Sequence, residues 1–268
     1  MRVTVCELPN VPAELDSAWN RLCNHTAGNL SELVLLPEFA FADPLWVSER
    51  YDDVLWIRAI QSCDAWLERL HELGVDFVVG TRPVTRDGHH FNEGFIWTRD
   101  RQCLPLRRKY FMPDEPGGWE AHWFTRGDSK FPRYSADSLS FGLNICSEIW
   151  ALETYAAYAS MNIHAVMCPR ATEPATRAKW LSAGVVAAVR AGAYCLSSNR
   201  VHPGLFGGAG WIIGPDGDLL AQTSADAPFS TVEIDPRVAE AAQSSYPRYV
   251  LAETPAATGW NRGSHRRK

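Results

Sequence analysis

The stretch "GLNICSEIW", residues Gly142 to Trp150, joins an apolar run to a polar one at a single cysteine. The run "LSFGLNIC" that ends at Cys146 has the length and character of a buried strand. A cysteine after such a strand is most often a small buried hydrophobe. The carboxyl end of a strand is also where functional side chains gather in α/β sheets. Two interpretations of Cys146 therefore remain open here, a structural thiol or a nucleophile.

Strand and helix patterns alternate on both sides of this stretch. Apolar runs predict strands at 3–8, 33–36, 76–80, 139–146, 164–169, 194–199 and 230–234. Hairpins are expected at 92–109, turning at Asp100-Arg101, and at 210–223, turning at Pro215-Asp216-Gly217. Helical spacing predicts helices at 13–24, 53–74, 148–161 and 175–193, the second of them stopping at Gly74. Two mixed sheets packed face to face, with helices outside, satisfy this order, so the predicted class is α/β.

Composition limits the classes of protein to which the chain can belong. Its 268 residues are 46% hydrophobic, which is enough for one sizeable α/β core. The formal net charge is -5 and basic residues are dispersed, so we expect no nucleic-acid partner. No apolar run reaches membrane-spanning length and the first residues do not resemble a signal peptide, so we expect no membrane partner and a cytoplasmic location.

The seven cysteines give little support to a disulfide framework or a metal site. Their number is odd, they are widely spaced, and no CxxC pair occurs. This pattern is typical of reduced thiols. The stretch "HELGV" begins like a zinc-protease motif but has Val75 where the second histidine would stand, so we expect no metal.

Two other polar groups follow apolar runs as Cys146 does. Glu38 comes just after the run in "LVLLPEF", and Lys109 ends the run in "LRRK". A carboxylate, an ammonium and a thiol at strand ends have complementary chemistry, as base, as cation and as nucleophile. A helix starting near Glu148 would direct its N-terminal dipole at Cys146 and favour the thiolate.

Together these stretches resemble the nitrilase superfamily of carbon–nitrogen hydrolases, whose members use a Glu–Lys–Cys triad. The resemblance runs from Arg2 to about Ile234, and Glu148 stands where an aspartate is commoner. Five motifs carry it in the family's order: "LVLLPEF", "RRKYF", "GLNICSEIWALE", "SSNRV" and "GWIIGPDGDLLA". It implies a four-layer αββα sandwich of two mixed β-sheets with outer helices. The catalytic domain would span 1–252, and 253–268 would form a flexible tail.

The resemblance also implies a mechanism that needs no cofactor. Glu38 would be the general base, Lys109 the cation that stabilises the oxyanion, and Cys146 the nucleophile that forms a thioester with a small amide or N-carbamoyl substrate. The backbone N–H of Ser147 would be a second oxyanion donor. Many members carry a second glutamate after the lysine, and we prefer Glu120 to Glu115. The Pro-Gly step before Glu120 is similar to the arrangement in the N-carbamoyl amidase branch.

Substrate-binding residues are predicted more weakly. Arg170 follows a strand at the same edge and can pair with a substrate carboxylate, or with Glu173 or Glu148 of the protein itself. Trp119 and Trp150 flank motif residues and are candidates for an apolar wall, with core packing as the alternative for each.

Other functions of the same fold stay open. The chain could be a nitrilase or a thioester-dependent acyltransferase of the superfamily, or a binding module that has kept the pocket and lost turnover. The family resemblance further implies a homodimer or larger homo-oligomer. The helix that contains Trp56 and Trp66 would supply apolar surface for it.

Overall fold

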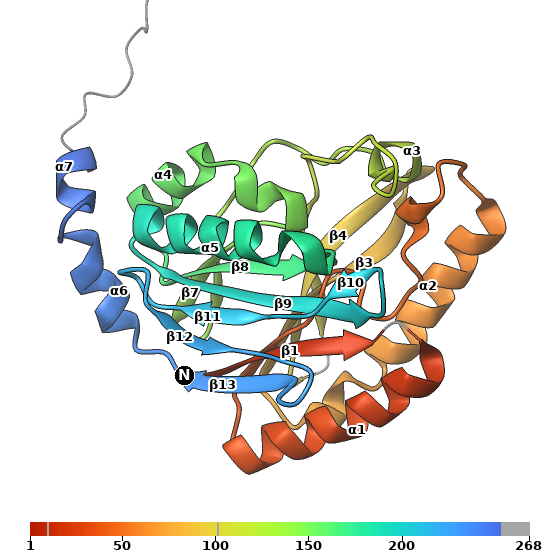
Figure 1. Cartoon of the computed structure of the whole chain (residues 1–268), viewed down its shortest axis with the longest axis horizontal. Helices are drawn as coiled ribbons and strands as arrows, with labels where there is room; N and C mark the ends of the chain where they lie inside the picture. The colour runs from red at the N-terminus through yellow and green to blue at the C-terminus, as the bar shows by residue number, and fades with distance from the viewer. Residues whose placement is uncertain (10, 101, 253–268) are drawn as a thin grey trace, which may run out of the picture.

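A computed structural model describes residues 1–9, 11–100 and 102–252, in which strands and helices alternate (Figure 1). The strands are β1 (Arg2–Pro9), β2 (Leu33–Leu35), β3 (Phe77–Arg86), β4 (His89–Thr98), β5 (Cys103–Arg108), β6 (Tyr134–Ala136), β7 (Leu139–Leu143), β8 (Ala165–Arg170), β9 (Tyr194–His202), β10 (Phe206–Gly207), β11 (Trp211–Ile213), β12 (Leu219–Gln222) and β13 (Phe229–Glu233). The α-helices are α1 (Pro12–Asn29), α2 (Asp53–Leu67), α3 (Glu120–Trp123), α4 (Glu153–Ser160), α5 (Arg177–Ala191), α6 (Pro236–Gln243) and α7 (Arg248–Ala252). The 3-10 helices are η1 (Leu45–Val47), η2 (Leu70–Leu73), η3 (Cys146–Trp150) and η4 (Pro174–Thr176).

The described strands form one large mixed sheet, which confirms the α/β class. Its main path runs β5-β4-β3-β2-β1-β9-β8-β7-β6. The two halves of the sheet meet on β1, which pairs in parallel with β2 through residues 3–5 and with β9 through residues 7–9. Strand β13 pairs antiparallel with β1, and the β11–β12 hairpin pairs with β9. The parallel strands β2, β7, β8 and β9 therefore bring chain segments that are distant in sequence to one edge.

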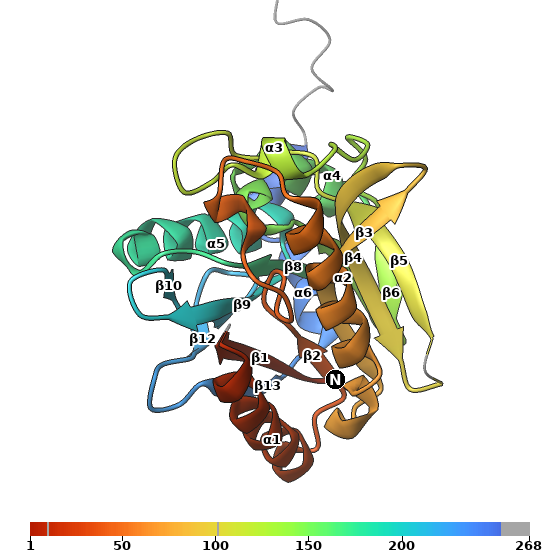
Figure 2. The ribbon, with the colours of Figure 1, turned by 90° about the vertical axis from the view of Figure 1, so that its right-hand side faces the viewer.

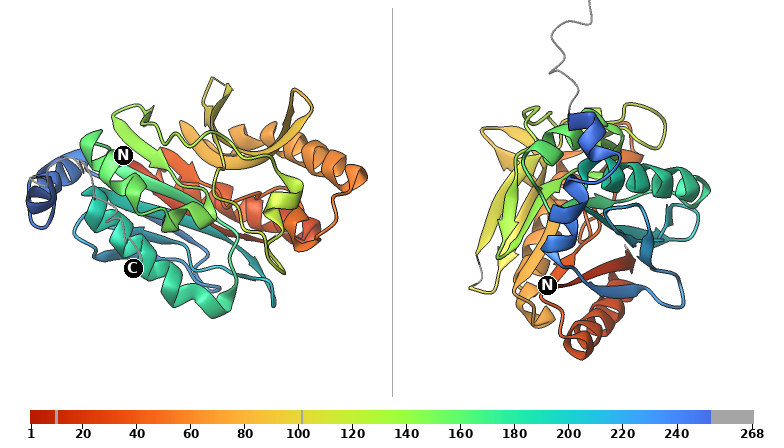
Figure 3. Two further views of the ribbon diagram at one scale, coloured as in Figure 1. Left: turned by 90° about the horizontal axis from the view of Figure 1, so that it is seen from above. Right: turned by 90° about the vertical axis from the view of Figure 1, so that its left-hand side faces the viewer.

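Helices cover the sheet on two sides. Figure 2 shows α1 and α2 beside one part of the sheet and α5 beside another. One apolar cluster joins α1 and α2 to the sheet through side chains such as Leu8, Trp19 and Val34. Another joins α5 to β9 and β11 through Ala187, Cys195 and Trp211. Helices α6 and α7 lie at one end, near the N-terminus (Figure 3), where the Met1 ammonium donates to the Ile234 carbonyl at 3.0 Å.

The boundaries of three predicted helices were wrong, and the first of them, predicted for 13–24, runs from Pro12 to Asn29. The helix predicted for 53–74 ends at Leu67, and the 3-10 helix η2 follows before Gly74, whose φ of 67° ends the segment as expected. The helix predicted for 148–161 is divided into η3 and α4. Strands β6 and β10 and helices α6 and α7 were not predicted. Both hairpins are present, but Arg101 of the first turn and the tail at 253–268 lie outside the described residues.

The tryptophans of α2 contribute to the core. Trp56 is only 3% exposed, and Trp66 packs edge-on against Trp19 and flat on Phe41. The exposed apolar surface of α2 comes instead from Val54, Leu55 and Ile57, and self-association through this helix stays a prediction. The seven cysteines are free thiols, as their spacing predicts. None of the helices described for 1–9, 11–100 and 102–252 is both long and apolar enough to cross a membrane.

Gly142 lets α4 approach the sheet closely. It lies in β7, opposite Val166 of β8, and a Cβ placed on it would overlap the ring of Tyr158. Tyr158 is fully buried and donates from its hydroxyl to the Leu143 carbonyl at 3.3 Å. A side chain at position 142 would therefore push α4 away from the strand that leads to Cys146.

Gly142→Ala should lower the free energy of unfolding by about 1–3 kcal/mol, because overpacking forces buried neighbours to move. Urea unfolding would measure this loss. The matched control is Gly28→Ala near the end of α1, where a Cβ meets nothing within 4 Å. The control should change stability by less than about 1 kcal/mol. Equal stability of Gly142→Ala and wild type would contradict the packing argument.

Candidate active site

Three strand ends bring the predicted catalytic side chains to one edge of the sheet. Glu38 follows β2, Lys109 follows β5 directly, and Cys146 follows β7. Strand β5 runs parallel to β2, because β2 pairs in parallel with β3 and the pairs β3–β4 and β4–β5 are both antiparallel. The carboxyl ends of the strands therefore lie on the same side, as the sequence suggested.

Lys109 contacts two carboxylates inside the protein. Its Nζ donates to Glu38 Oε1 at 2.9 Å and to Glu120 Oε1 at 2.7 Å. All three side chains are buried, with Lys109 itself fully inaccessible. The choice of Glu120 over Glu115 therefore fits the contacts, since Glu115 is exposed in the loop. Asn92, which sequence reasoning missed, donates from Nδ2 to Glu38 Oε1 at 2.8 Å and fixes that carboxylate.

The charges in this cluster depend on one another. Burial alone would lower the pKa of Lys109, but Glu120 and Glu38 outweigh it and raise that pKa above its ordinary value. Burial raises the pKa of Glu120 to about 7; Lys109 opposes the shift and Glu38 adds to it. At neutral pH the ammonium is thus fully charged, and Glu120 is close to taking up a proton.

Cys146 is a buried, neutral thiol at rest. Burial raises the pKa of its thiol well above the ordinary value, and Glu38 adds to the rise, while Lys109 and the backbone N–H of Ala171 oppose it. The prediction that a helix dipole would favour the thiolate was wrong. Cys146 begins only the short 3-10 helix η3, and α4 starts at Glu153. The sulfur therefore needs a base at the moment of attack.

Two positions of the site have left-handed backbone. Cys146 has φ 48° and Phe39, next to Glu38, has φ 50°. Such values are uncommon for residues other than glycine, and they persist where the surrounding structure holds them. The Phe39 N–H donates to Thr81 Oγ1 at 2.9 Å, and the Glu38 N–H donates to the Arg170 carbonyl at 3.1 Å. These two hydrogen bonds hold the backbone around the Glu38 carboxylate in an unusual turn.

Comparison with known proteins identifies the family. Residues 2–243 match the model of the family described as carbon-nitrogen hydrolase. The chain belongs to the carbon–nitrogen hydrolase family. The expected membership of the nitrilase superfamily is thereby confirmed.

Relatives of this carbon–nitrogen hydrolase are distant in sequence. The N-carbamoylputrescine amidases of Solanum lycopersicum and Solanum tuberosum are each 29% identical over 168 residues. These matches span 56% of this chain and 56% of each relative, so the chain spans about half the length of the curated relatives it matches.

Solved structures share the fold. A carbon-nitrogen hydrolase from Helicobacter pylori G27 has a TM-score of 0.82 at 20% identity, covering 93% of this chain and 94% of that one. Saccharomyces cerevisiae Nit3, a member of branch 10 of the nitrilase superfamily, has a TM-score of 0.75 at 18% identity, covering 92% and 94%. An amidase from Nesterenkonia sp. has a TM-score of 0.72 at 17% identity, covering 94% and 95%.

The predicted substrate-binding residues are not brought together. Ser147 is half-buried, donates from Oγ to the Phe111 carbonyl at 2.7 Å and lines a cavity of about 410 Å³. Trp119 precedes α3, and its backbone N–H donates to the Trp46 carbonyl at 2.8 Å. Trp150 is 48% exposed and packs on Trp180, with 5.5 Å between ring centroids. Neither tryptophan lines the cavity beside Ser147, so their role in an apolar wall stays a prediction.

Arg170 is fully buried and bound by the protein itself. Its Nε donates to Ser197 Oγ at 2.7 Å, one terminal nitrogen to Thr172 Oγ1 at 2.8 Å and the other to the Ala209 carbonyl at 2.7 Å. The guanidinium also lies over the ring of Trp211 at 3.9 Å. Each nitrogen has a neutral acceptor within the protein, and Glu148, one of the predicted glutamate partners, pairs with Arg107 instead. Pairing of Arg170 with a substrate carboxylate stays a prediction.

Arg200 was missed by the sequence reasoning. It is fully buried in β9, and no hydrogen-bond partner for its guanidinium occurs within the described part of the chain. Burial lowers its pKa to about 10, and Asp43, Cys63 and Glu38 act in the opposite direction. Arg200 therefore remains charged at neutral pH and contributes positive potential near Glu38.

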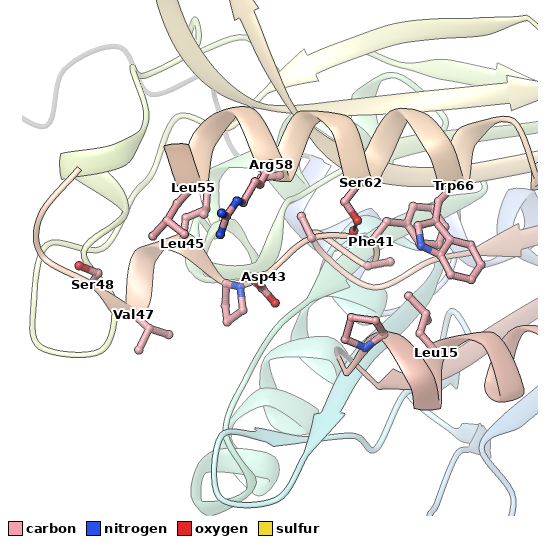
Figure 4. A pocket seen from close by; sticks show the side chains of 15 residues that line it. Leu15, Phe41, Asp43, Leu45, Val47, Ser48, Leu55, Arg58, Ser62 and Trp66 are labelled. Carbon is pink, nitrogen blue, oxygen red and sulfur yellow. Dashed lines mark hydrogen bonds between the residues drawn. The ribbon is translucent and has the colours of Figure 1, made fainter. Parts of the chain in front are cut away.

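A separate groove of about 380 Å³ lies between the start of α1, the segment 40–48 and α2 (Figure 4). Its lining is mainly apolar, with Phe41, Leu45 and Trp66, and Arg58 points into it from α2. None of the candidate catalytic side chains lines this groove.

Arg170→Lys should act on stability rather than on substrate choice. A lysine cannot satisfy three acceptors that are arranged around a planar guanidinium. We therefore expect the unfolding free energy to fall by about 3 kcal/mol, because each hydrogen bond to a charged group contributes about 1.5–3 kcal/mol. Denaturant unfolding measures the loss. Hydrolysis of matched amides with and without a distal carboxylate should show the same preference in both proteins. A lost preference for the acid at unchanged stability would restore the substrate-binding role.

Proposed function

We propose that this chain hydrolyses carbon–nitrogen bonds other than peptide bonds, in an amide or N-carbamoyl substrate, through a thioester on Cys146. The observation that carries the proposal is the buried Lys109 ammonium, held by Glu38 and Glu120 at the strand end next to Cys146. A buried ammonium between two carboxylates beside a thiol is costly to maintain for structure alone. It is well suited to acyl transfer, in which negative charge develops on an oxygen.

Attack begins with the neutral thiol. Glu38 removes the proton from Cys146 while the sulfur forms a bond to the carbonyl carbon. The electron pair of the carbonyl moves to its oxygen, where Lys109 and the backbone N–H of Ser147 stabilise the negative charge. Ser147 is the second residue of η3, where an N–H has no intrahelical acceptor. One such donor contributes about 3–4 kcal/mol to the transition state.

Release and hydrolysis reuse the same base. The tetrahedral intermediate collapses, the carbon–nitrogen bond breaks, and the proton held by Glu38 passes to the leaving amine. Glu38 then takes a proton from water, whose oxygen attacks the thioester carbon and displaces the Cys146 sulfur. The acid product leaves and the thiol recovers its proton. Glu120 keeps Lys109 charged and in place throughout.

Two further points belong to the same proposal. The N-carbamoylputrescine amidase relatives favour N-carbamoyl compounds among the substrates to be tried first. The finer description of the fold is a four-layer αββα sandwich. It is supported by an apolar cluster that joins Leu35 and Val79 of one part of the sheet to Phe141 and Leu196 of the other, with helices outside.

The function is tested with purified protein on a panel of amides, N-carbamoyl compounds and nitriles, with ammonia and acid detected separately. Turnover of an amide or N-carbamoyl compound supports the proposal. Turnover of nitriles alone would indicate a nitrilase. Acid release that gives way to amide formation when amines are added would indicate an acyltransferase, and no turnover of any member would indicate a binding module.

The catalytic residues are tested by single substitutions. Cys146→Ser should abolish turnover while the fold, followed by circular dichroism, persists. Lys109→Ala and Glu38→Gln should each lower kcat at least a hundredfold, roughly the effect of removing one oxyanion donor or base. A variant that keeps its kcat and loses only substrate affinity would show that its residue has been given the wrong role.

The pH dependence follows from the titration of Glu120. kcat/KM should rise as pH rises through about 7, where the pKa of Glu120 lies, because Glu120 then loses its proton and holds the Lys109 ammonium as a charged carboxylate. Glu120→Gln removes this titrating group, so the rise near pH 7 should disappear, and kcat should fall because Lys109 loses one charged partner. An identical pH profile in the variant would contradict this assignment.

A further inference from the structure

Glu148 is a buried carboxylate that the mechanism above does not use. It is fully inaccessible and follows Ser147 in η3. Its Oε1 accepts from the Tyr110 N–H at 2.7 Å and from the Phe111 N–H at 3.3 Å, and its Oε2 accepts from the Ile145 N–H at 2.9 Å. The carboxylate thus receives backbone donors from two segments that are distant in sequence.

The Arg107 guanidinium completes this arrangement. One terminal nitrogen donates to Glu148 Oε2 and the other donates to Oε1 at 3.0 Å, so the pair is bidentate. The guanidinium is itself fixed by a bond from Nε to the Lys130 carbonyl at 3.2 Å and by the ring of Phe131 at 3.9 Å. Arg107 therefore orients Glu148 from the strand that leads to Lys109.

The backbone donors to Glu148 are neighbours of Lys109 and Cys146 in the sequence. Tyr110 and Phe111 follow Lys109 directly, and Ile145 precedes Cys146 directly. On its other side the Glu148 carbonyl accepts from Asn144 Nδ2 at 2.8 Å. The backbone that follows Lys109 and the backbone that precedes Cys146 therefore both donate hydrogen bonds to the Glu148 carboxylate.

We propose that Glu148, oriented by Arg107, is a positioning residue that sets the placement of Lys109 relative to Cys146. This rests on the proposed function, because placement matters only if the two groups act on one substrate. Glu148 touches neither substrate nor reacting atoms and acts through the two backbone segments. A misplacement of about 1 Å between reacting groups costs about a hundredfold in rate.

The main test is Glu148→Gln, which keeps the length of the side chain and removes its charge. The NH₂ group of the new glutamine side chain is a donor and cannot accept the backbone N–H group that it faces. At least one of the two segments, residues 110–111 or Ile145, therefore loses its acceptor. We expect kcat to fall about a hundredfold with KM changed less than about threefold, since ground-state binding is not involved. Glu148→Asp, which keeps the charge on a shorter side chain, should recover part of kcat.

Two controls separate positioning from stability. Glu7→Gln alters another buried carboxylate that accepts a backbone N–H, that of Ala209 at 2.7 Å, away from both segments. It should lower the melting temperature and leave kcat of the folded protein within about twofold of wild type. Arg107→Lys keeps the positive charge and loses the bidentate contact with Glu148, so it should reproduce the loss of kcat. If Glu148→Gln does not fold, Arg107→Lys takes its place as the test.

Alkylation of Cys146 by iodoacetamide, followed by mass spectrometry of its peptide, gives a readout independent of substrate identity. If wild type hydrolyses nothing in the panel, the proposed function fails, while the alkylation rate still tests the placement. In folded Glu148→Gln the rate at pH 7 should fall about tenfold, because Glu38, held by Lys109, is no longer beside the thiol. An unchanged or faster rate, or a kcat equal to that of wild type, would overturn the positioning role.

Discussion

The rest of the site depends on one buried ammonium with two carboxylate partners. Lys109 could not stay charged inside the protein without Glu38 and Glu120 at hydrogen-bond distance. The same contacts fix the position of the Glu38 carboxylate. Burial raises the pKa of the neighbouring Cys146 thiol, the Glu38 carboxylate adds to the rise, and the thiol therefore stays neutral until a substrate carbonyl is present. A single ion cluster thus sets the charge of the cation, the position of the base and the resting state of the nucleophile.

Sequence reasoning succeeded where the signal is local. Apolar runs predicted the central strands, and Glu38, Lys109 and Cys146 are candidates because each lies at or just beyond the end of such a run, in a motif that resembles the family. It failed where the outcome depends on partners that are distant in sequence. The Cys146 thiol was predicted to ionise from a nearby helix, but its burial is set by the whole fold.

The two arginines show the same limit for binding residues. Arg170 is the last residue of β8 and Arg200 lies near the end of β9, and nothing local distinguishes them. Ser197 and Ala209, which satisfy Arg170, come to it only through the β8–β9 pairing and the turn before β11. Arg200 is buried without such acceptors among the residues described. The tertiary structure therefore decides which of the two guanidinium groups has hydrogen-bond acceptors. No motif in the sequence indicates it.

The position of β1 has a consequence for how the chain reaches this fold. The first strand pairs with β2 soon after it in sequence, but its other neighbours are β9 and β13, with Glu7 opposite Asn199 and Arg2 opposite Glu233. During synthesis these partners emerge from the ribosome long after β1, because β9 begins at Tyr194 and β13 at Phe229. The apolar strand at the N-terminus therefore keeps one edge unpaired until β13 has been made. Closure of the sheet is a late, long-range event, and a chain truncated before β13 would expose that edge to other chains.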